Sequence, residues 1–347
     1  MTRKIAFFDA KPYDRNSFNN INKTFGFEIT YIDAHLNAQT ALMTRGFDGI
    51  CAFVNDTIDK EVIEKLAERG IRNIGMRCAG YNNVDFKAAY GKIHVLRVPE
   101  YSPYAVAEHA TALILSLNRK TYRAYHRTRD GNFSINGLLG FDMKGKTVGV
   151  IGVGRIGKCF ISIMKGFGLR VLAYDPFPDT AYAESSGIEY TDLETIYRQA
   201  DIISLHCPLS EETHHIIDAR SISRMKDGVM IINTGRGKLI DTKALIAALK
   251  SGKIGSAGLD VYEEETEYFF EDRSMEVITD DVLARLLTFP NVLITSHQGF
   301  LTKEALHNIA ETTLNNFKNF FAGGYLEHEI CYQCGKDCRK KEKKRCF

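Results

Sequence analysis

Three residues in the second half of the chain have side chains that together could perform acid–base chemistry on a substrate carrying a carboxylate. Arg236 is flanked by glycines, and its planar guanidinium can bind a carboxylate through two parallel hydrogen bonds. His297 can exchange a proton near neutral pH. Glu265 lies in an acidic run and can stabilise a protonated histidine. One arginine, one carboxylate and one histidine indicate an acid–base active site, provided that the fold brings them together.

A glycine pattern in the middle of the chain predicts a dinucleotide site. Gly152, Gly154 and Gly157 form G-x-G-x-x-G directly after an apolar run and at the start of a helical pattern. The first glycine permits a tight turn, the second lets a pyrophosphate approach the backbone, and the third lets helix and strand pack closely. The phosphates would lie at a helix N-terminus, so the predicted cofactor site includes Arg155 and Ile156.

Asp175 predicts which dinucleotide binds. It ends the next predicted strand, 18 residues beyond Gly157, where a carboxylate can accept hydrogen bonds from the adenosine ribose and repel a 2′-phosphate. This favours NAD over NADP. The alternative is that Asp175 only starts the turn at Asp175-Pro176.

Several chemically active residues end predicted strands, and ligands of parallel α/β sheets bind at the carboxyl ends of the strands. The strand-end residues are Gly152, Asp175, His206-Cys207-Pro208, Thr234-Gly235-Arg236, Asp260 and His297. We therefore expect the chemistry to gather at one edge of a sheet.

Short β-branched runs alternate with helical patterns, which predicts parallel βαβ units in two series. The first series has predicted strands at 5–8, 49–54, 73–77 and 93–98. The second has predicted strands at 147–151, 170–174, 202–205, 229–233, 256–259 and 292–295. A long helix is predicted from Tyr104, and a last helix at 302–321 could return to the first domain. The expected class is α/β with two doubly wound parallel sheets.

Composition excludes several classes of protein. A chain of 347 residues that is 44% hydrophobic can bury a large core and suggests two domains. No uncharged apolar run approaches the roughly 18 residues of a membrane span, and the first eleven residues have no signal-peptide pattern, so we expect a cytoplasmic protein. The net charge of +2 combines +5 in residues 331–347 with −3 elsewhere, which does not support nucleic-acid binding.

The cysteines fall into two groups. Those of the body are scattered, unlike a secreted disulfide framework: Cys51, Cys78, Cys159 and Cys207. The last four crowd the tail: Cys331, Cys334, Cys338 and Cys346. Four thiols could bind Zn²⁺ or an iron–sulfur centre, but their spacing does not repeat the C-x2-C unit of common zinc sites. Because 339–345 has almost no apolar residues, we expect a solvated, flexible tail and assign no metal, leaving metal binding by the tail as the alternative.

In order and spacing, these motifs resemble the D-isomer-specific 2-hydroxyacid dehydrogenase family over roughly residues 1–330. The matching segments are 152–157, 206–209, 233–237, 258–265 and His297. Five further segments resemble the D-lactate dehydrogenase branch of the family: 77–85, 98–102, 118–120, 127–133 and 269–272. Gly235 and Gly299 stand where the family usually has a residue with a side chain, which loosens the local backbone.

The resemblance implies a role for each site residue. Arg236 would bind the carboxylate of pyruvate and polarise its carbonyl, His297 would donate the proton, and Glu265 would stabilise protonated His297. The backbone of Cys78, Ala79 and Gly80 would hold the substrate carboxylate, and Tyr101 and Phe300 would form a small apolar pocket. Asp260 would hold the nicotinamide carboxamide, and the cofactor would be lined by Cys207, Pro208, Thr234 and Gly235.

The resemblance also implies an activity and an arrangement of domains. The implied activity is fermentative reduction of pyruvate to D-lactate with NADH, in a homodimer or homotetramer. Residues 1–100 and 299–330 would form a flavodoxin-like substrate domain, 101–298 an inserted Rossmann NAD-binding domain, and 331–347 a tail, with the active site in a cleft between the domains.

Two alternative functions remain open at this point. One is a related enzyme for a larger 2-keto acid such as 2-ketoisocaproate or phenylpyruvate, because pocket size discriminates by only about 1–3 kcal/mol per methylene. The other is an NADH-sensing, corepressor-like binding protein that shares the fold.

Overall fold

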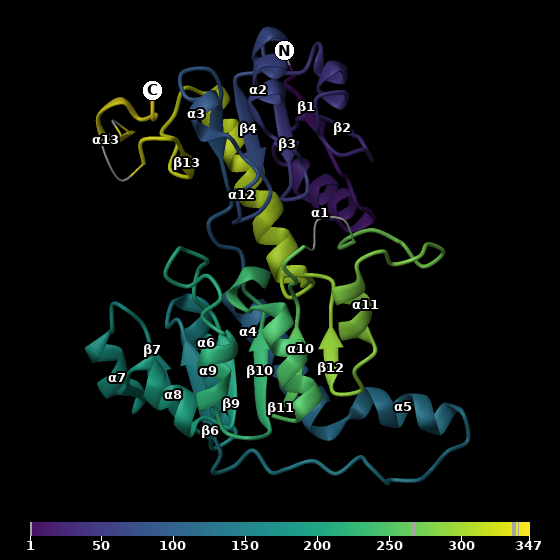
Figure 1. The fold of residues 1–347 in the computed structure, drawn as a ribbon. Coiled ribbons are helices and arrows are strands. Elements are labelled where there is room, and N and C mark those ends of the chain that lie inside the picture. The colour runs from purple at the N-terminus through teal and green to yellow at the C-terminus, as the bar shows by residue number, and fades with distance from the viewer. Residues whose placement is uncertain (1, 265–267, 335–337, 339) are drawn as a thin grey trace. The chain divides into compact units, whose positions relative to one another are not determined.

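The computed structural model describes residues 2–264, 268–334, 338 and 340–347. The chain divides into two units (Figure 1). The first comprises Met1–Ser102 and Leu301–Phe347, and the second comprises Pro103–Phe300. The first unit therefore contains both ends of the chain, and the second is a continuous insert.

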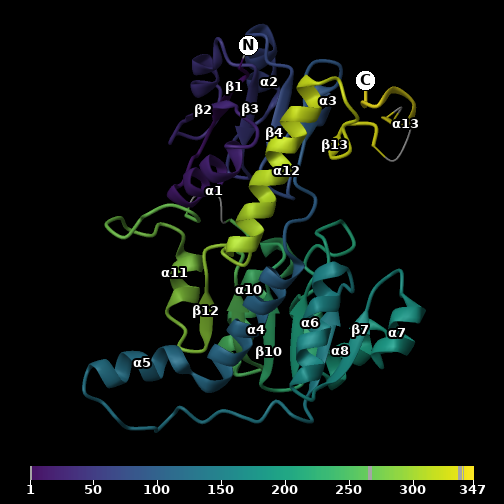
Figure 2. The same ribbon diagram turned by 180° about the vertical axis from the view of Figure 1, so that it is seen from behind.

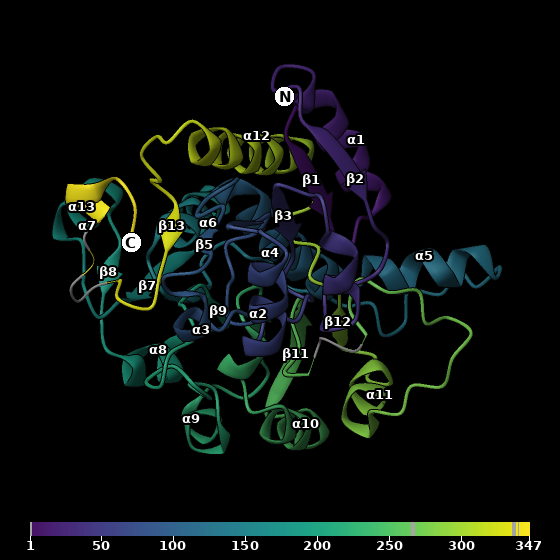
Figure 3. The ribbon, with the colours of Figure 1, turned by 90° about the horizontal axis from the view of Figure 1, so that it is seen from above.

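The first unit is built on a six-stranded sheet with the order β13-β5-β4-β3-β1-β2. Its strands are β1 (Lys4–Phe7), β2 (Glu28–Tyr31), β3 (Gly49–Ala52), β4 (Asn73–Met76), β5 (His94–Leu96) and β13 (Glu329–Ile330). All pairs are parallel except β13 with β5. Its helices are α1 (Pro12–Asn22), α2 (Lys60–Glu68), α3 (Phe86–Ala89), α12 (Lys303–Phe321) and α13 (Lys340–Lys343), with a 3-10 turn at Thr40–Thr44. Figure 3 shows α1 and α12 on one face of the sheet and α2 and α3 on the other.

The last long helix joins the first unit because its sequence caps it and gives it an apolar face. Thr302 accepts a hydrogen bond from the Ala305 N–H (3.2 Å) and so starts α12. Phe317 then packs directly over β4, where a Cβ on Gly75 would lie only 2.8 Å from the Phe317 ring. Burying such a phenylalanine stabilises the unit by about 1.5–3 kcal/mol.

The second unit is built on a seven-stranded parallel sheet with the order β12-β11-β10-β9-β6-β7-β8. Its strands are β6 (Thr147–Ile151), β7 (Arg170–Tyr174), β8 (Glu189–Tyr190), β9 (Ile202–Leu205), β10 (Val229–Asn233), β11 (Ile254–Leu259) and β12 (Val292–Ile294). Its helices are α4 (Pro103–Arg119), α5 (Thr121–Arg129), α6 (Arg155–Gly166), α7 (Thr180–Ser186), α8 (Leu193–Gln199), α9 (Ala219–Arg224), α10 (Thr242–Ser251) and α11 (Asp281–Leu287), with a 3-10 turn at Gly237–Leu239. Helices α4 and α6 cover one face (Figure 2), and α8, α9 and α10 cover the other (Figure 1).

The predicted fold class, two parallel-sheet α/β units, is confirmed. Every strand expected from the sequence is present, but the three short edge strands β2, β8 and β13 were missed. Two of them have only two residues, and β2 is exposed or half-exposed along its length, so none has the continuous apolar run of a buried strand. Within the described residues, no helix is long and apolar enough to span a membrane.

Candidate active site and cofactor site

The glycine-rich loop connects β6 to α6, and two of its glycines are required by packing. Gly152 has φ +97°, and a Cβ there would lie 2.4 Å from the backbone nitrogen of Cys207. A Cβ on Gly157 would lie 2.2 Å from the Gly152 carbonyl oxygen. At Gly154, the N-cap of α6, a Cβ would meet no atom within 4 Å. The loop therefore leaves open space at the helix N-terminus, next to exposed Arg155 and half-buried Ile156, where a phosphate group can approach the backbone.

Asp175 follows β7 and holds this loop in place. One carboxylate oxygen accepts a hydrogen bond from the Val153 N–H (2.8 Å), and the other accepts one from the Phe177 N–H (2.9 Å). The first bond fixes the glycine loop, and the second starts the turn at Pro176. Asp175 is half-buried, so its carboxylate lies at the sheet edge beside the open space at Gly154.

The next two strands end in residues that fit a bound dinucleotide. After β9, Cys207 is buried, and burial raises the pKa of its thiol to about 11, so the thiol is protonated at neutral pH. Pro208 beside it is exposed. After β10, the Thr234 hydroxyl is buried and has no hydrogen-bond partner in the described part of the chain. A buried hydroxyl without a partner is costly, so Thr234 fits a position that a ligand satisfies.

Arg236 follows Thr234 and is held by the amide side chain of Asn233, the last residue of β10. Asn233 is 1% exposed; its oxygen accepts from the Gly235 N–H (3.0 Å), and its Nδ2 donates to the Arg236 carbonyl (2.9 Å). Arg236 itself is half-buried and donates from Nη1 to the Gly235 carbonyl (2.8 Å). Asn233 is therefore a supporting residue that sets the direction in which Arg236 leaves the strand.

Asp260 directly follows β11, and its carboxylate organises the segment after β12. It is 1% exposed and accepts hydrogen bonds from the Thr295 hydroxyl (2.6 Å) and from the backbone N–H groups of Gln298 (2.9 Å) and Gly299 (2.8 Å). His109 Nε2 lies 3.2 Å from the same carboxylate. Burial opposes ionisation, but the bonds from His109, Thr295 and Gly299 hold the pKa of Asp260 below its usual value. The ionised Asp260 carboxylate therefore helps to fix the backbone of this segment.

His297 lies within the segment that Asp260 organises. Its N–H donates to the Asp260 carbonyl (2.8 Å), and its φ of +49° is uncommon for a residue with a side chain. Such conformations cost about 1–3 kcal/mol and concentrate at functional sites. The imidazole is half-buried, with the Phe270 ring centroid 5.7 Å away. Close packing explains the glycine at position 299, because a Cβ there would lie 2.9 Å from an Asp260 carboxylate oxygen.

The second unit therefore brings Arg236 and His297 to the carboxyl ends of parallel strands β10 and β12 of one sheet. The predicted third member, Glu265, lies outside the described residues. His109 was missed in the sequence because a histidine within a helix carries no signal until its contact with Asp260, far along the chain, is known.

The predicted substrate loop, Cys78 to Gly80, follows β4 in the first unit. Its three carbonyl groups accept hydrogen bonds from the Val98 N–H (3.1 Å), the Arg97 guanidinium (2.9 Å) and the Cys78 thiol (3.3 Å). The N–H groups of Ala79 and Gly80 form no hydrogen bond within the described part of the chain. The sequence did not reveal Arg97, because its role depends on a contact between the residue after β5 and Ala79, which follows β4.

The two aromatic residues of the predicted pocket lie close to the two points where the chain passes between the units. Tyr101 is half-buried and next to Ser102, and its carbonyl accepts a hydrogen bond from Asn308 Nδ2 (2.5 Å) on α12. Phe300 is the half-buried last residue of the second unit.

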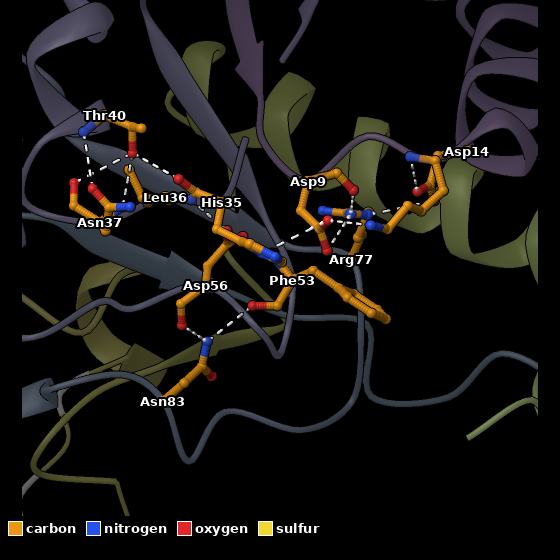
Figure 4. Close-up of polar contacts among 11 residues, drawn as sticks. Asp9, Asp14, His35, Leu36, Asn37, Thr40, Phe53, Asp56, Arg77 and Asn83 are labelled. Carbon is orange, nitrogen blue, oxygen red and sulfur yellow. Dashed lines mark hydrogen bonds and ion pairs between the residues drawn. The ribbon is translucent and has the colours of Figure 1, made fainter. Parts of the chain in front are cut away.

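The residue directly before the substrate loop, Arg77, is a buried arginine. Arg77 is 2% exposed and donates to the Asp9 carbonyl (2.6 Å), and its Nε lies 3.4 Å from the Asp14 carboxylate (Figure 4). Its guanidinium lies 4.5 Å from the Phe7 ring centroid and 4.6 Å from that of Phe53. Burial raises the pKa of Asp14, although Arg77 opposes this rise. Arg77 thus ties the residue before the loop to β1, β3 and α1.

Comparison with known proteins identifies close relatives along almost the whole chain. Residues 111–299 match the family model described as "D-isomer specific 2-hydroxyacid dehydrogenase, NAD binding domain". The D-lactate dehydrogenase of Escherichia coli K12 is 50% identical over 328 residues, covering 94% of this chain and 99% of that protein. The Salmonella D-lactate dehydrogenase structure is 51% identical with a TM-score of 0.85, over 94% of this chain and 99% of that one. The structure titled as the pyruvate reductase of Chlamydomonas reinhardtii is 42% identical with a TM-score of 0.90, over 94% and 98%.

Proposed function

This chain belongs to the D-isomer-specific 2-hydroxyacid dehydrogenase family and is an NAD-dependent oxidoreductase, and from that premise we propose that it is a D-lactate dehydrogenase that reversibly reduces pyruvate. One observation carries the choice of substrate. A D-lactate dehydrogenase shares half of its residues with this chain over 94% of the length. The net reaction is pyruvate + NADH + H⁺ to D-lactate + NAD⁺.

The proposed chemistry uses the residues at the ends of β10 and β12. Arg236 binds the pyruvate carboxylate and polarises the ketone, because its planar fork matches a carboxylate. His297 in its protonated form donates the proton that the ketone oxygen needs, and Glu265 stabilises that form. The bound cofactor supplies the hydride. Asp260 keeps His297 in place through its hydrogen bonds to the surrounding backbone.

The proposed cofactor site follows the carboxyl edge of the second sheet. Gly154 leaves room for the pyrophosphate, Asp175 faces the ribose, and the Thr234 hydroxyl gains the partner that it lacks within the described chain. Cys207, Pro208 and Gly235 line the same edge. Asp260 is the residue proposed to bind the nicotinamide carboxamide. Its carboxylate also accepts hydrogen bonds from Thr295, Gln298 and Gly299.

The proposed substrate domain comprises 1–100 with 299–330, and the NAD-binding domain comprises 101–298. The amides of Ala79 and Gly80, which form no hydrogen bond in the described part of the chain, would hold the substrate carboxylate, because two successive N–H groups can bind one anion as a small nest. Tyr101 and Phe300 are the residues that we propose to contact the methyl group of the substrate.

Steady-state kinetics across four 2-keto acids test this function. With NADH as reductant, kcat/KM should be highest for pyruvate and lower for 2-ketoisocaproate, phenylpyruvate and hydroxypyruvate. The product from pyruvate should be oxidised by an authentic D-lactate dehydrogenase and not by an L-specific enzyme. A higher kcat/KM for one of the larger acids would reassign the substrate, and NADH binding without any turnover would indicate a sensor rather than an enzyme.

Three further expectations from the sequence stay proposals: a fermentative role, a cytoplasmic location, and a homodimer or homotetramer. An apolar arm after α5 supports the last of these. Phe133, Ile135 and Leu139 are 77%, 80% and 88% exposed, and side chains of this kind gathered on one segment mark an interface. A second copy of the chain is the partner that we propose, and sedimentation of wild type against Leu139→Lys tests it.

A further inference from the structure

Four cysteine side chains of the C-terminal segment converge on one point. The Sγ atoms of Cys331, Cys334, Cys338 and Cys346 all lie within 4.8 Å of one another. Individual Sγ–Sγ distances are 3.8 Å for Cys334–Cys331, 4.0 Å for Cys331–Cys338 and 3.5 Å for Cys338–Cys346. This convergence contradicts the solvated tail expected from the sequence, and it lies beyond the residues matched by the family model.

These separations match a single tetrahedral ion. Four sulfurs at the usual zinc–sulfur length of about 2.3 Å form a tetrahedron with edges of about 3.8 Å. A disulfide would need about 2.0 Å between sulfurs, and all four cysteines are free. An iron–sulfur cluster places several irons and sulfides between its thiolates, which therefore stand farther apart than the ligands of one ion.

The surroundings of the four thiols fit a thiolate–metal site in burial and in charge. Cys331 is 8% exposed and Cys346 is 2% exposed, so the site is closed on one side. The Cys331 N–H donates to the Cys334 sulfur (3.2 Å), which helps to hold that sulfur beside Cys331. Four thiolates around one divalent ion carry a formal charge of −2, and the net +5 of residues 331–347 compensates it.

The segment is anchored to the edge of the first sheet through Glu329 of β13. One oxygen of this buried carboxylate accepts a hydrogen bond from the Cys346 N–H (2.7 Å), and the other lies 2.5 Å from His94 Nδ1 on β5. The Phe347 ring stacks on the His94 ring at 4.1 Å with an interplanar angle of 10°. Tyr90 donates to the Gln333 side chain (2.8 Å). The C-terminal end of the cluster therefore contacts the sheet edge, and Gln333 near its N-terminal end contacts the residue that follows α3.

We propose that Cys331, Cys334, Cys338 and Cys346 bind one Zn²⁺ ion in a closed, structural site that fastens the C-terminal segment to β5. The free energy of zinc binding would order the segment. Residues 339–345 are almost entirely polar and cannot order themselves by apolar burial. Four protein ligands leave no open position for a substrate, so the site stabilises structure and takes no part in pyruvate reduction. The proposal does not depend on the identity of the 2-keto acid.

Metal analysis of the full chain tests the site. Protein purified without chelator and with a thiol reductant should contain one zinc per chain. Cys331→Ser and Cys346→Ser should each lose the metal, whereas Cys159→Ser, a matched change outside the tail, should retain it. Replacing zinc by Co²⁺ should give the sulfur-to-cobalt charge-transfer and intense d–d absorption of a tetrahedral thiolate site.

A second measurement on wild type covers the case in which a variant fails to fold. Alkylation followed by mass spectrometry should show the four tail cysteines protected with zinc and modified after chelation, while NADH-dependent pyruvate reduction persists. Four freely alkylated thiols in protein as purified, disulfide-linked tail cysteines without metal, or equal metal loss in Cys159→Ser would each overturn the proposal.

Discussion

The guanidinium of Arg236 is the group on which the proposed substrate binding depends most directly. Its backbone is fixed on both sides by Asn233, so a substitution that keeps the charge changes the shape of the donor group and little else. Arg236→Lys replaces a planar fork by a point charge, and losing one charge-assisted hydrogen bond costs about 1.5–3 kcal/mol. We expect kcat/KM for pyruvate to fall about 10- to 100-fold, with KM raised and kcat lowered.

Steady-state kinetics with Arg198→Lys as control check this prediction. Arg198 is an exposed residue on α8 that pairs with Glu194, so its change should leave both constants near wild type. Equal kcat/KM values for Arg236→Lys and the control would remove Arg236 from the site.

Glu265 can be tested through the pH profile, although it lies outside the described residues. If its carboxylate stabilises protonated His297, Glu265→Gln destabilises the acid form that donates the proton. Reduction of pyruvate should then decline at a lower pH than in wild type as the pH rises, and the declining limb of the profile should shift by about one unit. The profile of kcat/KM between about pH 5 and 9 measures this shift.

The neighbouring Glu264→Gln is the matched control for Glu265→Gln, since Glu264 is exposed in the same acidic run. Coincident profiles for Glu265→Gln and wild type would show that another group supports His297.

At the scale of elements, the end of β5 positions the substrate loop after β4. Arg97 donates to the Ala79 carbonyl (2.9 Å), and its guanidinium lies 5.0 Å from the Tyr81 ring centroid. Arg97 is a positioning residue, because these contacts hold the loop without supplying a group for the chemistry. Arg97→Lys should cost about 1 kcal/mol of loop ordering and raise KM for pyruvate about fivefold.

The kinetic split separates this role from a general loss of stability. KM for NADH and the Tm should stay near wild type in Arg97→Lys, because the cofactor site lies in the other unit. Arg72→Lys serves as control, since the Arg72 guanidinium donates to the carbonyl groups of Ala67 and Ile71 and does not contact the substrate loop in the described part of the chain. A rise in KM for NADH as large as that for pyruvate would contradict a positioning role confined to the loop.

At the scale of the whole molecule, one histidine links stability to pH. His206 lies after β9, where burial lowers its pKa to about 3; its Nε2 lies 2.9 Å from the Ser204 hydroxyl, and its ring 4.8 Å from that of Phe160. The unfolded chain takes up a proton on this imidazole near pH 6.5, and the folded chain does so only near pH 3. The stability contributed by neutral His206 is therefore complete above about pH 6.5 and is lost as the pH falls.

Between those two values the free energy of unfolding should fall by about 1.4 kcal/mol per pH unit from this group alone. His206→Asn removes the titration, so its unfolding free energy should fall less steeply than that of wild type in urea titrations over this range. The exposed His307→Asn should keep the wild-type slope. A His206→Asn slope equal to that of wild type would show that other groups account for the acid sensitivity.

The local patterns of the sequence were sufficient for the fold class, the family and the cofactor. The roles of Gly152, Gly154 and Gly157 depend on a loop within one βα unit, so the six residues 152–157 are enough to predict the cofactor loop. Arg236 and His297 could be proposed from the strands before them, because parallel strands carry their chemistry at one edge. The edge strands β2, β8 and β13 could not, because their pairing depends on neighbours elsewhere in the chain.

Only the tertiary structure showed which residues support the site and how the tail packs. Arg97, His109 and Arg77 act through partners that their own segments do not reveal: Ala79, Asp260 and Asp14. For the tail, the spacing of the cysteines did not match a common zinc pattern, whereas β13 and the Glu329 carboxylate return Cys346 to the vicinity of Cys331. Spacing along a chain limits which residues can meet, but only the packed sheet edge determines which of them do.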